Sequence, residues 1–183
     1  MFSKIIKDFF LKKIVSKKLL SYDLKLPTDK IISVGVIVDD KFFKEIEFLK
    51  TEIEHFGIAK ENIKILVYKN ITNKKEVDEG LFLTLKDVKI NGEISKKEIN
   101  DFISYPFDLL INYYEGNNPV LVLLSKTSKS SFKVGFVSVD KRVNDFIVDL
   151  HLNQYKEFVA ELFKYLKILK KLYQTQVTKA HTH

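Results

Sequence analysis

Polar and charged side chains follow three apolar segments of the chain that are typical of buried strands. They are Asp39 and Asp40 after the first segment, Tyr114, Glu115, Asn117 and Asn118 after the second, and Ser138, Lys141 and Arg142 after the third. Ligands of open parallel sheets bind beyond the carboxyl ends of the strands, so parallel strands would gather these groups at one edge. With the N-terminus of a helix beginning at Asn118 beside them, they would suit an anionic small molecule such as a nucleotide or a sugar phosphate.

Arg142 is the only arginine among the 31 basic residues of the chain. Its planar guanidinium can hold a carboxylate or a phosphate through two parallel hydrogen bonds, which a lysine cannot do. One interpretation is therefore an anion clamp made with Lys141. The other is a salt bridge to Asp140, Asp145 or Glu115, and we favour it because ion pairs commonly occupy such loops.

Asp39 and Asp40 follow a predicted buried strand. In this position they resemble the acidic residues of receiver domains and of haloacid-dehalogenase-type phosphatases. Receiver domains also need a phospho-acceptor Asp at the end of a later strand, where this chain has Asn112. The phosphatases need the pattern Asp-x-Asp, and here Lys41 follows the acidic pair. Neither activity is implied, and we expect Asp40 to cap the following helix instead.

The chain lacks the sequence motifs of the common catalytic and metal-binding sites. It contains no Cys, which excludes disulfides and thiolate ligands, and its four His are scattered. It has no glycine-rich phosphate loop and no nucleophile elbow. We therefore predict no catalytic residue, no metal and no cofactor, and keep an enzyme acting at the sheet edge as an alternative.

Alternating apolar patterns predict a single α/β domain over residues 31–173. Strands are expected at 31–38, 62–68, 81–88, 107–114, 132–139 and 146–150, and helices at 42–56, 96–104, from Pro119 onward, and at 153–173. This order is typical of a three-layer α/β/α, Rossmann-like fold with a mostly parallel sheet of about five strands. Residues 1–22 are expected to form a basic amphipathic helix, 23–30 a linker and 174–183 a flexible tail.

The N-terminal segment carries most of the net charge. Residues 1–22 hold six Lys and one Asp, which is +5, whereas the other 25 basic and 23 acidic residues give only +2. One face of the predicted helix could dock on an anionic membrane or on a partner through Phe2, Lys4, Ile5, Ile6, Lys7, Phe9, Phe10, Lys12, Lys13, Lys17 and Lys18.

Three interpretations of this helix stay open. It could lie on a membrane surface. It could bind nucleic-acid phosphates, although Lys without Arg recognises RNA or DNA only weakly. It could also pack on its own domain or on a second copy in a homodimer. A second apolar face at Leu11, Ile14 and Val15 indicates that the helix is either kinked or apolar on two sides.

Two resemblances follow from particular segments. Residues 107–136, with FDLLIN and NNPVLVLLSKTSKSSFKVGF, resemble the N-terminal Rossmann-like domain of heptosyltransferase-type glycosyltransferases, whose nucleotide-sugar domain has no counterpart in these 183 residues. Through residues 34–40, 107–114, 132–136, 139–150 and 158–169, the whole chain is similar to a family of short uncharacterised α/β proteins of flavobacteria and other Bacteroidota. The first resemblance implies no transferase activity, and the second implies the fold and no activity.

Taken together, these patterns predict a non-enzymatic binding or assembly module. No signal peptide and no membrane-spanning stretch is apparent, so we expect a cytoplasmic protein, peripheral to the inner membrane if its first helix is free. The alternatives are a binder of anionic small molecules, or an enzyme, at the carboxyl edge of the sheet, and an RNA- or ribosome-associated protein.

Overall fold

The computed structural model describes residues 2–21, 24, 26, 30–70 and 80–172. The expected tail at 174–183 and most of the expected linker at 23–30 lie outside these residues, as does the side chain of Phe2. The strands are β1 (Val34–Asp39), β2 (Ile63–Lys69), β3 (Leu81–Thr84), β4 (Leu109–Tyr113), β5 (Phe132–Phe136) and β6 (Phe146–Val148). The helices are α1 (Phe2–Leu19), α2 (Ile46–His55), α3 (Lys97–Ser104), α4 (Pro119–Thr127) and α5 (Tyr155–Ile168), with short 3₁₀ turns η1 (Lys60–Asn62) and η2 (Leu85–Asp87).

The strands form one six-stranded sheet in the order β3-β2-β1-β4-β5-β6, and all neighbours are parallel. The predicted Rossmann-like α/β fold is confirmed. The sheet has one strand more than the expected five, because the short segments at both edges each pair with a neighbour. The segment beginning at Leu81 runs parallel to β2.

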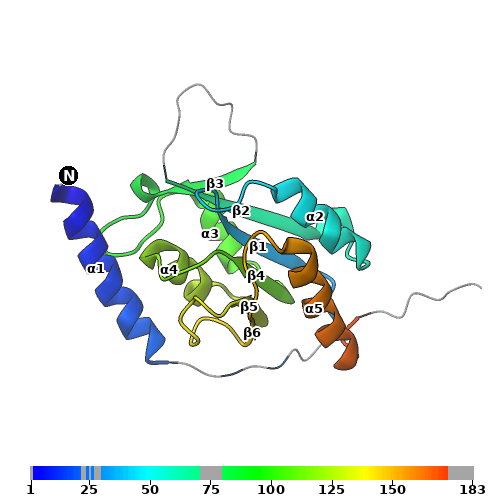
Figure 1. Cartoon of the computed structure of the whole chain (residues 1–183). Helices are drawn as coiled ribbons and strands as arrows, with labels where there is room; N and C mark the ends of the chain where they lie inside the picture. Colours follow the sequence, from blue (N-terminus) through cyan, green and yellow to red (C-terminus); the bar gives the residue numbers. More distant parts are fainter. Residues whose placement is uncertain (1, 22–23, 25, 27–29, 71–79, 173–183) are drawn as a thin grey trace, which may run out of the picture.

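Helices cover both faces of the sheet (Figure 1). The side chains of α2 and α5 join β1, β4 and β5 in one apolar cluster, and those of α3 and α4 join the opposite face in a second cluster. Every residue of β1 is buried, as its continuous β-branched run predicts for a central parallel strand.

Helix α1 forms an additional layer outside α4 (Figure 1). It is one continuous helix whose Leu11, Val15 and Leu19 are buried in the same cluster as α4. This contact explains why α4 is apolar on all sides, since the sheet covers one side of α4 and α1 covers another. Of the two alternatives for the first helix, the helix that is apolar on two sides is the one observed.

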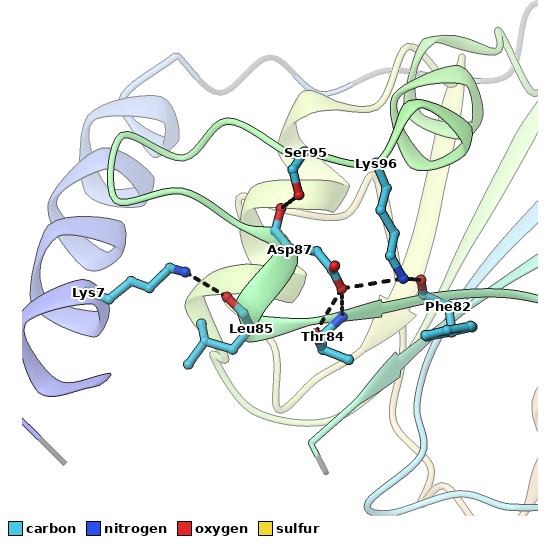
Figure 2. Close-up of polar contacts among 7 residues, drawn as sticks. All are labelled: Lys7, Phe82, Thr84, Leu85, Asp87, Ser95 and Lys96. Carbon is cyan, nitrogen blue, oxygen red and sulfur yellow. Dashed lines mark hydrogen bonds and ion pairs between the residues drawn. The ribbon is translucent and has the colours of Figure 1, made fainter. Parts of the chain in front are cut away.

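A second set of contacts fixes α1 beside the end of β3. Lys7 of α1 donates from Nζ to the main-chain oxygen of Leu85 at 2.7 Å, as Figure 2 shows. The strand ends at Thr84, where a capping box with Asp87 begins the turn η2. Lys96 Nζ reaches Asp87 Oδ2 at 3.5 Å and the Phe82 carbonyl at 3.1 Å, which ties α3 to the same turn.

Two helix boundaries differ from the prediction. Helix α2 begins at Ile46 instead of residue 42, because the main-chain N–H groups of Phe42 and Phe43 bond to the Asp39 carbonyl in a turn. Asp40 was expected to cap this helix, and that expectation is wrong: the N-cap residue is Glu45, and no side chain caps it. Helix α5 ends at Ile168, where the chain turns and Ile31 N–H bonds to the Lys171 carbonyl.

Candidate functional site

A pocket of about 300 Å³ opens at the carboxyl edge of the sheet. It lies where the strand order reverses, since the chain leaves β1 for α2 on one face and leaves β4 for α4 on the other. Such a switch point is where open α/β sheets place their ligands. Its polar lining residues are Lys4, Asp8, Asp39, Lys41, Tyr68, Asn70, Glu115 and Asn118, and its apolar ones are Phe42, Leu85, Pro119 and Val120.

Asp39 at the end of β1 supplies the most buried charged group of the pocket, with 2% of the residue exposed. Its Oδ1 accepts hydrogen bonds from the Lys41 N–H and from Asn70 Nδ2, both at 3.0 Å. Burial raises the pKa of Asp39, and these two donors oppose the rise. The result is a carboxyl group that is held in place by its neighbours and desolvated at the pocket wall.

Tyr68 and Asn118 line the pocket from β2 and from the start of α4. Burial raises the pKa of the Tyr68 hydroxyl, and the Asn118 side chain opposes this rise. The Oδ1 of Asn118 also accepts from the Val120 N–H at 3.0 Å, as the predicted N-cap requires. Because Pro119 has no N–H and that of Val120 is occupied, this helix start offers an anion fewer donors than expected from the sequence.

Charges of both signs surround the pocket. Glu115 follows β4, and Asp8 projects from α1, where Lys12 Nζ lies 3.3 Å from its carboxylate. Lys4 and Lys41 are exposed, and Lys41 Nζ lies 4.7 Å from the centroid of the Phe42 ring. The buried carboxyl group is thus combined with two solvent-exposed ammonium groups.

The residues after β5 form a separate turn. Arg142 donates from Nε to Asp140 Oδ1 at 2.9 Å and from a terminal nitrogen to Asp140 Oδ2 at 2.6 Å. This guanidinium lowers the pKa of Asp140 to about 2. The favoured interpretation of Arg142 as an ion-pair partner of Asp140 is therefore confirmed, and its fork is already occupied.

The other predicted site residues are divided between this turn and the core. Asn117 accepts from the Asp140 N–H at 2.8 Å, and Ser138 and Lys141 are exposed on the turn. Tyr114 is fully buried beneath α4, where its hydroxyl lies 2.8 Å from Ser125 Oγ.

The structure thus brings together only part of the set predicted from the sequence. Asp39, Glu115 and Asn118 line the pocket, whereas Asp40 lies beside it, with Lys44 Nζ 3.6 Å from its carboxylate. Tyr68, Asn70, Asp8 and Lys41 also line the pocket, and the sequence analysis did not place them there. Tyr68 ends the second predicted strand and Asn70 lies two residues beyond it, but only the pairing of this strand with β1 puts them beside Asp39.

The first half of α1 presents a second feature of functional interest. Ile5 and Phe9 are 63% and 65% exposed, and Ile6 and Phe10 are exposed beside them. The basic side chains that follow, Lys12, Lys13, Lys17 and Lys18, are exposed as well, whereas Lys7 is bound to Leu85. We call the exposed surface formed by Ile5, Ile6, Phe9 and Phe10 the outer face of α1.

Neither a metal-ligand cluster nor a membrane-spanning helix occurs among the described residues. No group of three or more His, Cys, Asp or Glu side chains in this part of the chain is arranged to hold a metal ion. No helix within the described ranges has both the length and the apolar character needed to cross a bilayer.

A comparison with models of protein families gives a match. A family model described as "Family of unknown function (DUF6913)" matches residues 7–169, which span α1 to α5. No curated protein matches the chain.

Proposed function

The chain belongs to a family of unknown function, DUF6913, and we propose that it is a non-enzymatic binding module that attaches to an anionic lipid surface through the outer face of α1. The observation that carries this proposal is the two-sided character of α1. Its inner face is buried on α4, yet four large apolar side chains remain on the opposite side, in the open.

The composition of this face suits a lipid surface better than water. Apolar side chains in the first half of α1 can enter the boundary between headgroups and acyl chains, as in interfacial amphipathic helices. Lys12, Lys13, Lys17 and Lys18 are exposed along the second half of the helix, and each basic residue near an anionic surface contributes about 1 kcal/mol. Because the cytoplasmic leaflet is the anionic one, the proposal places the protein in the cytoplasm, beside the inner membrane.

The other partners are supported less well. An RNA-binding surface would need Arg or stacking aromatics among its basic residues, and the basic half of α1 has only Lys. A second copy of the chain could cover the outer face, but the Lys residues of two such helices would then repel each other. The local likeness of residues 107–136 to heptosyltransferase-type enzymes stays a prediction about the fold.

Flotation of the full-length chain on lipid vesicles tests the attachment. We expect the chain to float with phosphatidylglycerol-containing vesicles at low salt and to remain in the bottom fraction with phosphatidylcholine vesicles. Salt at 1 M should release it from the anionic vesicles, because charges more than about 3 Å apart are then screened. The variant Ile5→Ser/Phe9→Ser should lose flotation. The matched control is Phe48→Ser/Ile168→Ser, which changes side chains that are 63% and 69% exposed on α2 and α5.

Two results would contradict the proposal. One is equal flotation of the Ile5→Ser/Phe9→Ser variant and the control variant. The other is a concentration-dependent dimer that the same double substitution dissociates, because the outer face would then be the contact between two copies.

A further inference from the structure

We propose that the pocket at the carboxyl edge of the sheet binds a small zwitterion, which carries a primary ammonium group and a carboxylate or a phosphate. This proposal is independent of the lipid attachment. The pocket can be tested with soluble ligands, and no vesicles are needed. The argument rests on where the two signs of charge lie around the pocket.

The ammonium end is assigned to Asp39. Its Oδ1 is occupied by the Lys41 N–H and by Asn70 Nδ2, while no donor among the described residues reaches its Oδ2. Burial makes an unpaired carboxylate costly, and a ligand ammonium would supply both the missing charge and the missing hydrogen bond. Glu115 and the hydroxyl of Tyr68 line the same pocket and can accept the other ammonium protons.

The anionic end is assigned to Lys4 and Lys41. Both line the pocket, both are exposed, and neither forms an ion pair with any side chain in the described part of the protein. They come from different segments, one from α1 and one from the turn after β1, so that they can approach an anion from two directions. Lys7, which is bonded to Leu85, fixes the helix that carries Lys4 (Figure 2).

The size of the pocket limits the ligand. A volume of about 300 Å³ is at the lower end for ligand sites. A nucleotide would also need phosphate-binding N–H groups, which Pro119 and the capped Val120 do not supply.

A second pocket, of about 400 Å³ between α3 and α4, is lined by the exposed charged side chains of Glu93 and Lys129 and by no buried charged side chain. Its walls include Ile103, Leu123 and Leu124, and its Asn100 amide already donates to the carbonyls of Ile94 and Lys96.

Calorimetric titration and thermal shift of the full-length chain test the inference with named probes. We expect phosphoethanolamine and β-alanine to bind and to raise the melting temperature. Ethanolamine and inorganic phosphate, each of which carries one of the two charges, should bind at least tenfold more weakly. Phosphocholine, whose quaternary ammonium has no N–H, should also bind more weakly.

Variants assign the binding to particular groups. Asp39→Asn keeps the size of the side chain and should weaken phosphoethanolamine binding at least tenfold. Glu115→Gln and Lys4→Met should weaken phosphoethanolamine binding severalfold. Glu115 is partly exposed and Lys4 is exposed, so these two variants should fold. They therefore test the inference even if Asp39→Asn has a folding defect. The control is Arg142→Met, which lies outside the pocket and should bind as the natural chain does.

The inference is overturned if neither zwitterion binds, if ethanolamine or phosphate alone binds as tightly, or if Asp39→Asn and Glu115→Gln leave affinity unchanged. Binding to vesicles distinguishes a lipid headgroup from a free metabolite as the ligand. Retention on phosphatidylethanolamine vesicles that depends on Asp39 and that phosphoethanolamine competes away indicates a lipid headgroup, and binding of the soluble probes alone indicates a free metabolite.

Discussion

At the scale of single residues, a buried polar network joins β4, α4 and the turn between β5 and β6. Asn112 Nδ2 donates to Asn144 Oδ1 at 2.7 Å, and Ser125 Oγ donates to Asn112 Oδ1 at 2.7 Å. Asn144 is buried, and its own Nδ2 has no partner among the described residues. Gly135 of β5 lies directly below this amide, so the absence of a side chain at position 135 makes room for it.

Gly135→Ala should therefore destabilise the protein. The added Cβ would lie 2.5 Å from Asn144 Nδ2, and the buried amide has little space in which to move. We expect the free energy of unfolding to fall by about 1–3 kcal/mol, the usual cost of overpacking, measured by urea denaturation. The same substitution in an Asn144→Ala background should cost much less, and an equal cost in both backgrounds would show that the contact with Asn144 is not the cause.

Among the candidate site residues, the sequence could identify edge positions but not their neighbours. Asp39, Glu115 and Asn118 were found because each follows a predicted strand, and strand ends lie at the sheet edge whatever the strand order. Tyr68 and Asn70 were missed because their place beside Asp39 depends on the pairing of β1 with β2, which one sequence does not reveal. Tyr114 lies one residue beyond β4, and the turn of the chain there directs its side chain to Ser125.

At the scale of secondary-structure elements, α1 carries two apolar faces with different roles. Leu11→Ala on the inner face should lower the free energy of unfolding by about 2–5 kcal/mol, since Leu11 is fully buried in the cluster shared with α4. Ile5→Ala on the outer face should change it by no more than about 0.5 kcal/mol, as is usual at exposed positions. Urea denaturation of the two variants measures the difference, and similar losses for both would contradict the assignment of the two faces.

The elements themselves were largely predictable, and the errors have local physical causes. A continuous β-branched run identified β1, an apolar run identified β4, and Asn118-Pro119 gave the start of α4. The start of α2 was placed too early because Phe42 fits the helical spacing, although the Asp39 carbonyl holds that segment in a turn. The parallel direction of β3 could not be predicted, because four residues carry no signal that distinguishes the two directions.

At the scale of the whole molecule, α1 unites the two proposed binding features. Lys4 and Asp8 line the pocket, Ile5 and Phe9 lie on the outer face, and Leu11 and Val15 belong to the apolar cluster. A surface contact along the first turns of α1 would therefore adjoin the pocket wall. The sequence suggested a division between a basic helix at 1–22 and a domain beginning at residue 31, but this packing favours one folding unit.

Removal of residues 1–22 tests whether the helix belongs to that unit. Leu11, Val15 and Leu19 are buried, and at about 1.5–3 kcal/mol for each side chain their burial contributes about 5–9 kcal/mol. That range is comparable with the whole stability of an ordinary domain, about 5–15 kcal/mol. The shortened chain should therefore unfold or aggregate near 37 °C, as followed by circular dichroism and size-exclusion chromatography, whereas Ile5→Ser/Phe9→Ser should melt close to the natural chain. If the shortened chain instead melts within a few degrees of the full one, α1 is an appendage, and truncation becomes a valid test of its attachment to membranes.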